Sequence, residues 1–164
     1  MNAPSTPLTP ATFDIAEPVA KLVDYYQTIS PESVAQLGQY YAASAYFKDP
    51  FNEVHDSQAI AHIFEHMFLA LTEPRFVVTN QIVQGDQCFL TWEFHFRFKN
   101  FDSNTPQVIL GGSHLRFSNG GLVSYHRDYW DAAEELYEKI PLLGSLMRWI
   151  KKREKSARDS FRKA

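Results

Sequence analysis

Residues 87–98 read QCFLTWEFHFRF, a run in which apolar and polar side chains alternate. One side of an extended chain would carry Cys88, Leu90, Trp92, Phe94, Phe96 and Phe98. The other side would carry Thr91, Glu93, His95 and Arg97. A period of two is typical of a β-strand with one buried face. The stretch therefore predicts a strand of an antiparallel sheet whose aromatic face packs against helices.

Four further extended runs flank this strand, and turn signals separate those that follow one another directly. The turn signals are Gly85-Asp86, a polar loop over residues 100–106, and Asn119-Gly120-Gly121. The predicted strands cover residues 40–50, which end at Asp49-Pro50, and residues 75–84, 107–118 and 122–130.

Helical periodicity marks the remaining segments. Residues 18–28 and 56–72 carry apolar side chains at helical spacing, and the second stripe ends before Pro74. Ser30-Pro31-Glu32 predicts the start of a short helix, and further helices are expected from Asp131 and from Pro141. Helices followed by a run of antiparallel strands predict an α+β fold in which helices cover one face of a curved sheet.

The composition indicates one folded domain. The chain has 164 residues, of which 45% are hydrophobic and 15% aromatic. Residues 1–13 are rich in proline and lack an apolar period, so we expect a flexible leader there. Cys88 is the single cysteine and cannot form an internal disulfide, and the start of the chain lacks an export signal. We therefore expect a cytoplasmic protein.

Charge is distributed unevenly along the chain. The net charge is -3, yet residues 148–164 hold eight of the sixteen basic residues and two of the nineteen acidic ones. Residues 141–164 therefore predict a basic amphipathic helix. Such a helix can dock on an acidic surface of its own protein or of a dimer partner, and contact with nucleic acid or a membrane is the alternative.

The last predicted strand raises a chemical question. It contains YHRDYW, residues 125–130, and alternation that turns Asp128 inward also turns His126 and Trp130 inward. A buried carboxylate is costly unless it is hydrogen-bonded or kept for proton chemistry. Asp128 is therefore either a hydrogen-bonded structural residue or a candidate acid/base.

These motifs resemble a known family. Asp49-Pro50 at the end of a strand, GDQC at 85–88, HLRF at 114–117 and GLVSYHRDYWD at 121–131 are similar to the SnoaL-like proteins of the nuclear transport factor 2-like superfamily. The resemblance implies a cystatin-like cone over residues 14–140: a curved, mostly antiparallel sheet wrapped around helices, with a ligand pocket in its open end. The basic helix would be an addition to this cone. Many members are dimers, so the resemblance also implies a homodimer through the sheet.

The same resemblance implies roles for individual residues. Asp49 is similar to the general base of the ketosteroid isomerases, and Asp128 to the acid/base aspartate of SnoaL-type cyclases. The oxyanion pair of the isomerases is incomplete, because Ser113 stands at its aspartate and no tyrosine aligns cleanly, although Tyr25 and Tyr26 are near. The arginine and second aspartate of the limonene epoxide hydrolases fall on Trp92 and Phe94, so that triad is absent.

We therefore expect an apolar chamber suited to proton transfer on a hydrophobic small molecule. The candidate catalytic residues are Asp128, Asp49 and His126. The candidate ligand-binding residues are Trp92, Phe94, Ser113, Leu115, Trp130 and Tyr26. We expect no metal and no cofactor, and a reaction of isomerase, cyclase or lyase type.

Structural alternatives exist for this chemistry. The protein could bind a ligand without reaction or act as a dimeric scaffold, and Asp49 could simply accept backbone N–H groups in the DPFNE turn of residues 49–53. Residues 62–66 spell H-x-x-E-H, an inverted zinc-protease pattern. Helical geometry places His62, Glu65 and His66 opposite the apolar stripe, so we predict that they face solvent and bind no metal.

Overall fold

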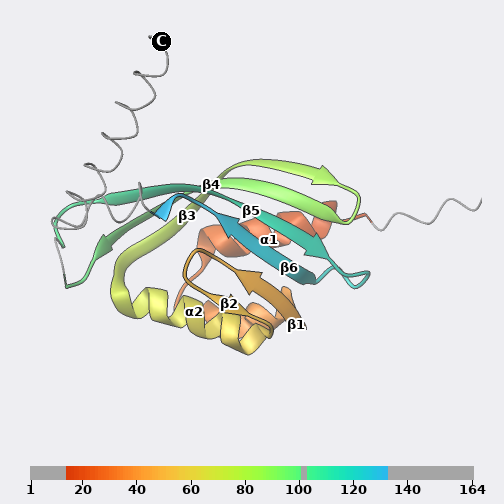
Figure 1. Cartoon of the computed structure of the whole chain (residues 1–164), viewed down its shortest axis with the longest axis horizontal. Helices are drawn as coiled ribbons and strands as arrows, with labels where there is room; N and C mark the ends of the chain where they lie inside the picture. Colours follow the sequence, from red (N-terminus) through yellow and green to blue (C-terminus); the bar gives the residue numbers. More distant parts are fainter. Residues whose placement is uncertain (1–13, 101–102, 133–164) are drawn as a thin grey trace, which may run out of the picture.

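The computed structural model describes residues 14–100 and 103–132. The predicted leader, the predicted basic C-terminal helix and the helix expected after Asp131 fall on residues outside these ranges. Within them the chain forms the α+β cone that the sequence predicts, with a curved sheet and helices on one side of it (Figure 1).

Six strands form one mixed sheet in the order β2-β1-β6-β5-β4-β3. All neighbouring pairs are antiparallel except β1 and β6, which run parallel. The strands span Tyr41–Lys48 (β1), Glu53–Val54 (β2), Leu71–Gln84 (β3), Gln87–Phe98 (β4), Gln107–Phe117 (β5) and Val123–Tyr129 (β6). The parallel pair brings the first strand of the chain beside the last one, so residues far apart in sequence meet at its centre.

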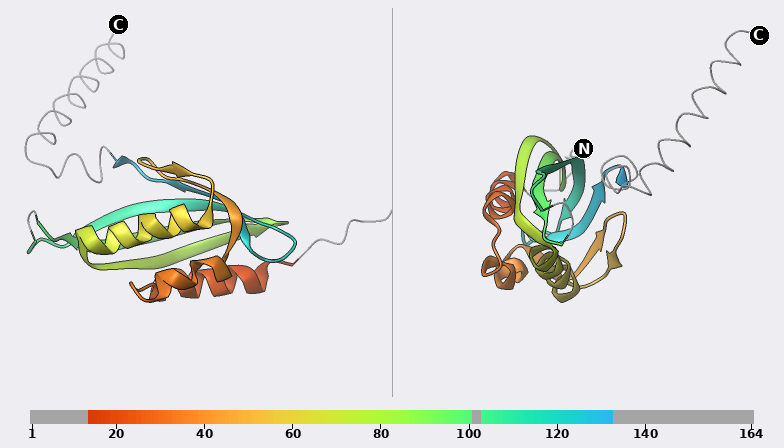
Figure 2. Two further views of the ribbon diagram at one scale, coloured as in Figure 1. Left: turned by 90° about the horizontal axis from the view of Figure 1, so that it is seen from below. Right: turned by 90° about the vertical axis from the view of Figure 1, so that its left-hand side faces the viewer.

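Helices close the concave side of the sheet (Figure 2). They are α1 (Ala16–Thr28), the 3₁₀ helix η1 (Ser33–Gln39) and α2 (Ser57–Ala70). Asp56 starts α2 by accepting a hydrogen bond from the backbone N–H of Ala59 at 2.7 Å. Val19, Leu22 and the other buried residues of α1 pack into the same core as the sheet. None of the described helices is both long and apolar enough to cross a membrane.

The alternation of β4 is confirmed. Cys88, Leu90, Trp92 and Phe96 are buried in the core cluster, while the polar set lies on the other face. Gly111 of β5 stands opposite Trp92, and a Cβ atom there would lie 2.3 Å from the indole ring. The absence of a side chain at residue 111 therefore lets the indole lie across the neighbouring strand.

The start of β3 differs from the prediction. The sequence placed it at Arg75 after a break at Pro74, but the strand begins at Leu71, directly after α2. Glu73 has a φ of 51°, and the pairing with β4 is irregular between Thr72 and Arg75. Because β3 is an edge strand, the irregularity accommodates a proline without breaking the sheet.

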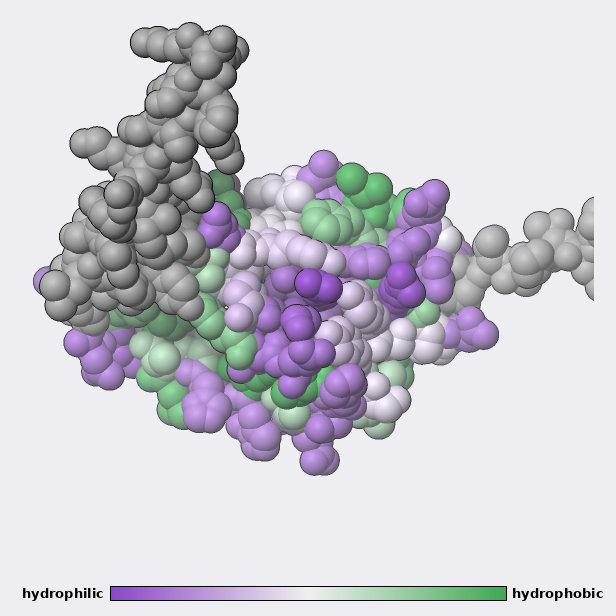
Figure 3. Space-filling view, in the orientation of Figure 1, coloured by the Kyte–Doolittle hydropathy of each residue, from purple (hydrophilic) through white to green (hydrophobic). Residues whose placement is uncertain are grey.

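Apolar side chains remain on the surface of the sheet. Green surface gathers over the β3–β4 hairpin (Figure 3), where Ile82 and Val83 are 62% and 45% exposed. Phe89, Leu110 and Tyr129 are also exposed large hydrophobic residues of the sheet. Val83 pairs with the buried Cys88, so it lies on the face opposite to Ile82, which pairs with Phe89. We call Ile82, Phe89, Leu110 and Tyr129 the outer apolar patch.

Candidate functional site

A cavity of about 410 Å³ lies between the concave side of the sheet and the helices. This volume falls within the range of small-molecule sites, roughly 300–1,000 Å³. Its walls are mostly aromatic and aliphatic, and they include Phe47, Phe51, Phe76, Trp92, Phe94, Phe96, Phe98 and Trp130. Few polar groups reach the cavity, so each of them is a candidate functional group.

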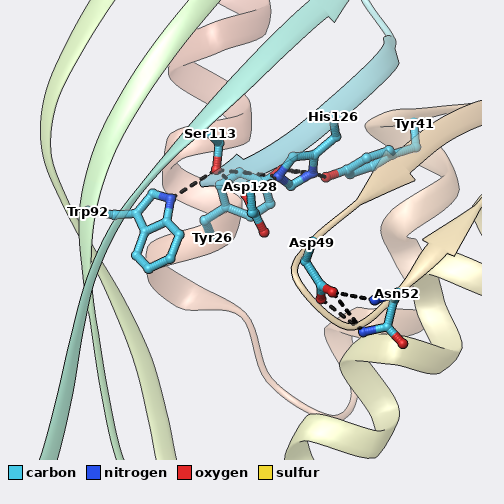
Figure 4. Close-up of polar contacts among 8 residues, drawn as sticks. All are labelled: Tyr26, Tyr41, Asp49, Asn52, Trp92, Ser113, His126 and Asp128. Carbon is cyan, nitrogen blue, oxygen red and sulfur yellow. Dashed lines mark hydrogen bonds and ion pairs between the residues drawn. The ribbon is translucent and has the colours of Figure 1, made fainter. Parts of the chain in front are cut away.

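Asp128 of β6 is the centre of a polar cluster in the cavity wall (Figure 4). Its Oδ1 atom accepts hydrogen bonds from the Ser113 hydroxyl at 2.5 Å and from Nε2 of His126 at 2.7 Å. Ser113 in turn accepts a hydrogen bond from the indole N–H of Trp92 at 2.9 Å. Because residues 126 and 128 share one face of β6, the strand itself brings the imidazole to the carboxylate.

Two tyrosines hold the other side of the imidazole. The Tyr41 hydroxyl lies 2.6 Å from Nδ1 of His126, and the Tyr26 hydroxyl contacts that of Tyr41. Burial raises the pKa of both phenols well above the ordinary value, so both keep their protons at neutral pH. Both hydroxyls therefore contact the imidazole side of the cluster as neutral phenols.

These groups form one hydrogen-bonded chain. The Tyr26 and Tyr41 hydroxyls bond to each other, the Tyr41 hydroxyl bonds to Nδ1 of His126, and Nε2–H donates to Asp128. Oδ1 of Asp128 is fully engaged, whereas Oδ2 has no hydrogen-bond partner among residues 14–100 and 103–132. The cavity thus contains one carboxylate oxygen available to a ligand.

Asp49 is arranged differently. It lines the cavity, but its carboxylate points to Asn52 in the following loop (Figure 4). The backbone N–H groups of Phe51 and Asn52 donate to Oδ1 at 2.7 and 2.6 Å, and the Asn52 side chain donates to both oxygens. These contacts match the turn-capping alternative, because the carboxylate satisfies the loop rather than facing an open partner.

The cavity brings together most of the predicted site residues. Its lining includes Asp128, Asp49, His126, Trp92, Phe94, Ser113, Trp130 and Tyr26. Leu115 is fully buried beneath His126 in the adjacent strand and does not line the cavity, so it packs in the core instead of forming a wall.

The helix motif of residues 62–66 faces solvent, as predicted. His62 and Glu65 are exposed and form an ion pair at 2.7 Å. His66 is also exposed, and it reaches the rim of the cavity. No group of three potential metal ligands gathers within residues 14–100 and 103–132.

Tyr41 and Asn52 are the polar partners that sequence reasoning missed. Tyr41 reaches His126 only because β1 pairs with β6, with Phe47 opposite His126. Asn52 reaches Asp49 across a tight loop. A Tyr-Tyr pair at the start of a predicted strand gives no local signal for the first contact, although Asp-Pro-Phe-Asn is a turn pattern that could have indicated the second.

A cone-shaped sheet with a ligand-sized cavity at its concave side defines the class of nuclear transport factor 2-like folds. The SnoaL-like domain matches residues 22–126, which is more than half of the chain. The protein belongs to this SnoaL-like family.

Solved structures share the fold at low sequence identity. A hypothetical protein with a ketosteroid isomerase-like fold from Catenulispora acidiphila, in complex with trimethylamine, is 17% identical, with a TM-score of 0.63 over 74% of this chain and 90% of that one. A putative SnoaL-like polyketide cyclase from Shewanella putrefaciens is 14% identical, with a TM-score of 0.63 over 78% and 96%. An LEH-like epoxide hydrolase from M. tuberculosis is 11% identical, with a TM-score of 0.60 over 77% and 89%. No curated protein matches the chain.

Proposed function

We propose that this protein is a cofactor-independent enzyme of isomerase, cyclase or lyase type that moves a proton on a hydrophobic small molecule. The observation that carries the proposal is the Oδ2 atom of Asp128, which has no hydrogen-bond partner in the described part of the chain and borders an apolar cavity, while Oδ1 is anchored by Ser113 and His126. A fixed carboxylate oxygen beside aromatic walls can act as a general base, because the substrate excludes water when it fills the cavity.

The neighbouring groups have positioning roles in this proposal. Ser113 and His126 fix the orientation of the carboxylate, and Trp92 fixes Ser113. Asp128 takes a proton from a carbon of the substrate through Oδ2 and can return it to another atom of the same molecule. Groups of this kind contribute typically about 10²- to 10⁴-fold in rate.

Epoxide hydrolysis is not part of the proposal, although one structural neighbour carries that name. Trp92 and Phe94 stand where the resemblance places the arginine and second aspartate of that reaction. An indole and a phenyl ring can form walls, but neither can replace a guanidinium or a carboxylate.

Nitrobenzisoxazole provides a test that needs no knowledge of the natural substrate. It is a flat apolar molecule from which a base removes one ring C–H proton while the N–O bond breaks, and the product is a coloured cyanophenolate. The proton passes to Asp128 and then to solvent. We expect turnover above that of free carboxylate in solution, and a fall of at least about 100-fold in Asp128→Asn.

Asp86→Asn is the matched control, because it makes the same chemical change in the exposed β3–β4 turn, outside the cavity lining. It should react like the wild type. Equal turnover in wild type and Asp128→Asn, with both folded, would contradict the proposal. Saturable binding of the probe without turnover would favour the non-catalytic ligand-binding alternative.

We also propose a homodimer through the sheet. The observation that favours it is the outer apolar patch, whose residues, among them Phe89 and Leu110, are 37–62% exposed at the sheet surface. Light scattering should give twice the mass of one chain, and Leu110→Glu should reduce it to one. A monomeric wild type at micromolar concentration would contradict this arrangement.

A further inference from the structure

We infer that the cavity sorts ligands by charge: it admits neutral and cationic flat hydrophobic molecules and excludes carboxylates and other anions. The inference rests on the proposed function in one respect, namely that the cavity is the ligand site. It adds the charge class of the ligand, which neither the fold nor the family assignment states.

The described lining of the cavity contains acidic side chains but no lysine or arginine. Asp49 and Asp128 supply carboxylates, and His66 and His126 supply imidazoles. Nε2–H of His126 is already bonded to Asp128, and His66 lies exposed at the rim. An anion that enters therefore meets two carboxylates and no lysine or arginine among the described lining residues.

Basic residues beside the cavity are engaged with other groups. Lys99, which follows the lining residue Phe98, donates to the backbone carbonyl of Phe68 at 2.7 Å. Lys48 forms an ion pair with Glu53 at 2.5 Å, and the Arg127 guanidinium lies over the Tyr129 ring at 4.9 Å. Strand alternation places Arg127 on the face of β6 opposite to Asp128. Lys48 and Arg127 border an outer depression that also contains the carboxylates of Asp49, Asp128 and Asp131, so that depression is acidic on balance as well.

Hydrogen-bond donors in the wall are also engaged. The Trp92 indole N–H donates to Ser113, the Asn52 side-chain amide donates to Asp49, and the Tyr26 hydroxyl contacts Tyr41. A bound carboxylate would lose its hydration without gaining these donors, which is costly in an apolar site. Repulsion by the like charge of Asp128 adds to that cost.

A cation meets the opposite situation. Oδ2 of Asp128 can accept a hydrogen bond from an ammonium group, and the faces of aromatic rings attract positive charge. Phe76 and Phe94 stack with centroids 4.4 Å apart in the cavity wall, and Trp92 meets Phe76 edge to face. A neutral ketone lies between these cases, since it needs neither a counter-charge nor full hydration.

Three naphthalene derivatives of nearly equal shape test this inference at neutral pH. Methyl naphthyl ketone is neutral, the matching naphthylethylamine is an ammonium ion, and naphthoate is an anion. Isothermal titration of the full-length protein should show the ammonium ion binding at least as tightly as the ketone, and naphthoate at least about tenfold more weakly. Naphthoate binding as tightly as the ketone overturns the inference, and so does failure of all three to bind.

Measurements at different salt concentrations and on a variant test whether the discrimination against anions arises inside the cavity. Long-range repulsion by the net charge of -3 is screened at high ionic strength, whereas repulsion inside the cavity is not, so the order should persist from low to high salt. Asp128→Asn should reduce the difference between ketone and naphthoate, and Asp86→Asn should leave it unchanged. Loss of the difference at high salt, or an undiminished difference in Asp128→Asn, overturns the assignment to the cavity. Because these are binding measurements, absence of nitrobenzisoxazole turnover leaves their outcome independent of the proposed reaction.

Discussion

The hydrogen bond from Tyr41 to His126 offers a direct measure of how the site is built. Tyr41→Phe removes the hydroxyl that lies 2.6 Å from Nδ1 of His126, while both side chains are almost completely buried. Leaving a buried acceptor unsatisfied costs about 1–3 kcal/mol. The Tyr26 hydroxyl already lies 3.4 Å from the same nitrogen and can move in as a substitute. We therefore expect Tyr41→Phe to lower the free energy of unfolding by about 1 kcal/mol, the lower part of that range.

Because the Tyr26 hydroxyl can take the place of the lost Tyr41 hydroxyl, the stability losses of the two variants should not be additive. Tyr26→Phe alone leaves the bond from Tyr41 to the imidazole intact, so its effect should be smaller than that of Tyr41→Phe. The double variant leaves Nδ1 without either donor, so its loss should exceed the sum of the single losses by about 0.5–1 kcal/mol.

Guanidinium unfolding, followed by tryptophan fluorescence and circular dichroism, measures all three losses. Tyr129→Phe is the control, because Tyr129 is 45% exposed on the outer face of β6 and should change stability by less than about 0.5 kcal/mol. Strictly additive single losses, or a Tyr41→Phe variant as stable as the Tyr129→Phe control, would refute the hydrogen-bonded chain from Tyr26 to His126.

Three further predictions concern the fold around the site. Gly111→Ala should destabilise the protein by about 1–3 kcal/mol, because the new methyl would meet the Trp92 ring, whereas Gly38→Ala, with no atom near its Cβ position, should be almost neutral by the same unfolding measurement. Burial raises the pKa of Cys88 to about 12 from 9.0, so the folded protein keeps the thiol proton between these pH values while the unfolded chain loses it. The free energy of unfolding should therefore fall as pH rises from about 9 to about 12, by up to about 1.4 kcal/mol per pH unit. In Cys88→Ala it should fall less steeply. The Asp49 carboxylate caps a turn, so Asp49→Ala should lose about 1–2 kcal/mol of stability. Asp49→Asn should retain nitrobenzisoxazole turnover. A stable Asp49→Asn protein without turnover would restore Asp49 as a base.

Sequence patterns predicted what depends on local periodicity. The alternation of β4 assigned its buried face, and the alternation of β6 placed His126 and Asp128 on one side. Neither pattern shows how deeply a residue is buried. Leu115 was correctly assigned to the inner side of β5, but it lies in the core and does not line the cavity.

The remaining features depend on which segments meet. Tyr41 reaches His126 because β1 and β6 pair in parallel across more than 80 residues of chain, and no local pattern encodes that pairing. Pro74 was expected to delay β3, but an edge strand with an irregular register tolerates it. Helical periodicity correctly assigned His66 to solvent, but it does not show that this residue also borders the mouth of a cavity.

The polar chain from Tyr26 to Trp92 is difficult to explain as a device for stability. Buried polar groups that satisfy one another often contribute no more than well-packed apolar residues of the same volume. Here all the donors converge, directly or through a neighbour, on a single oxygen of Asp128, and the second oxygen remains open to an aromatic cavity. Oδ2 has no partner among the described residues, and the Asp128 side chain is 18% exposed, so this oxygen can be reached from outside the core. The arrangement is better explained by a ligand that supplies the missing partner, either as a donor or as an acidic C–H group.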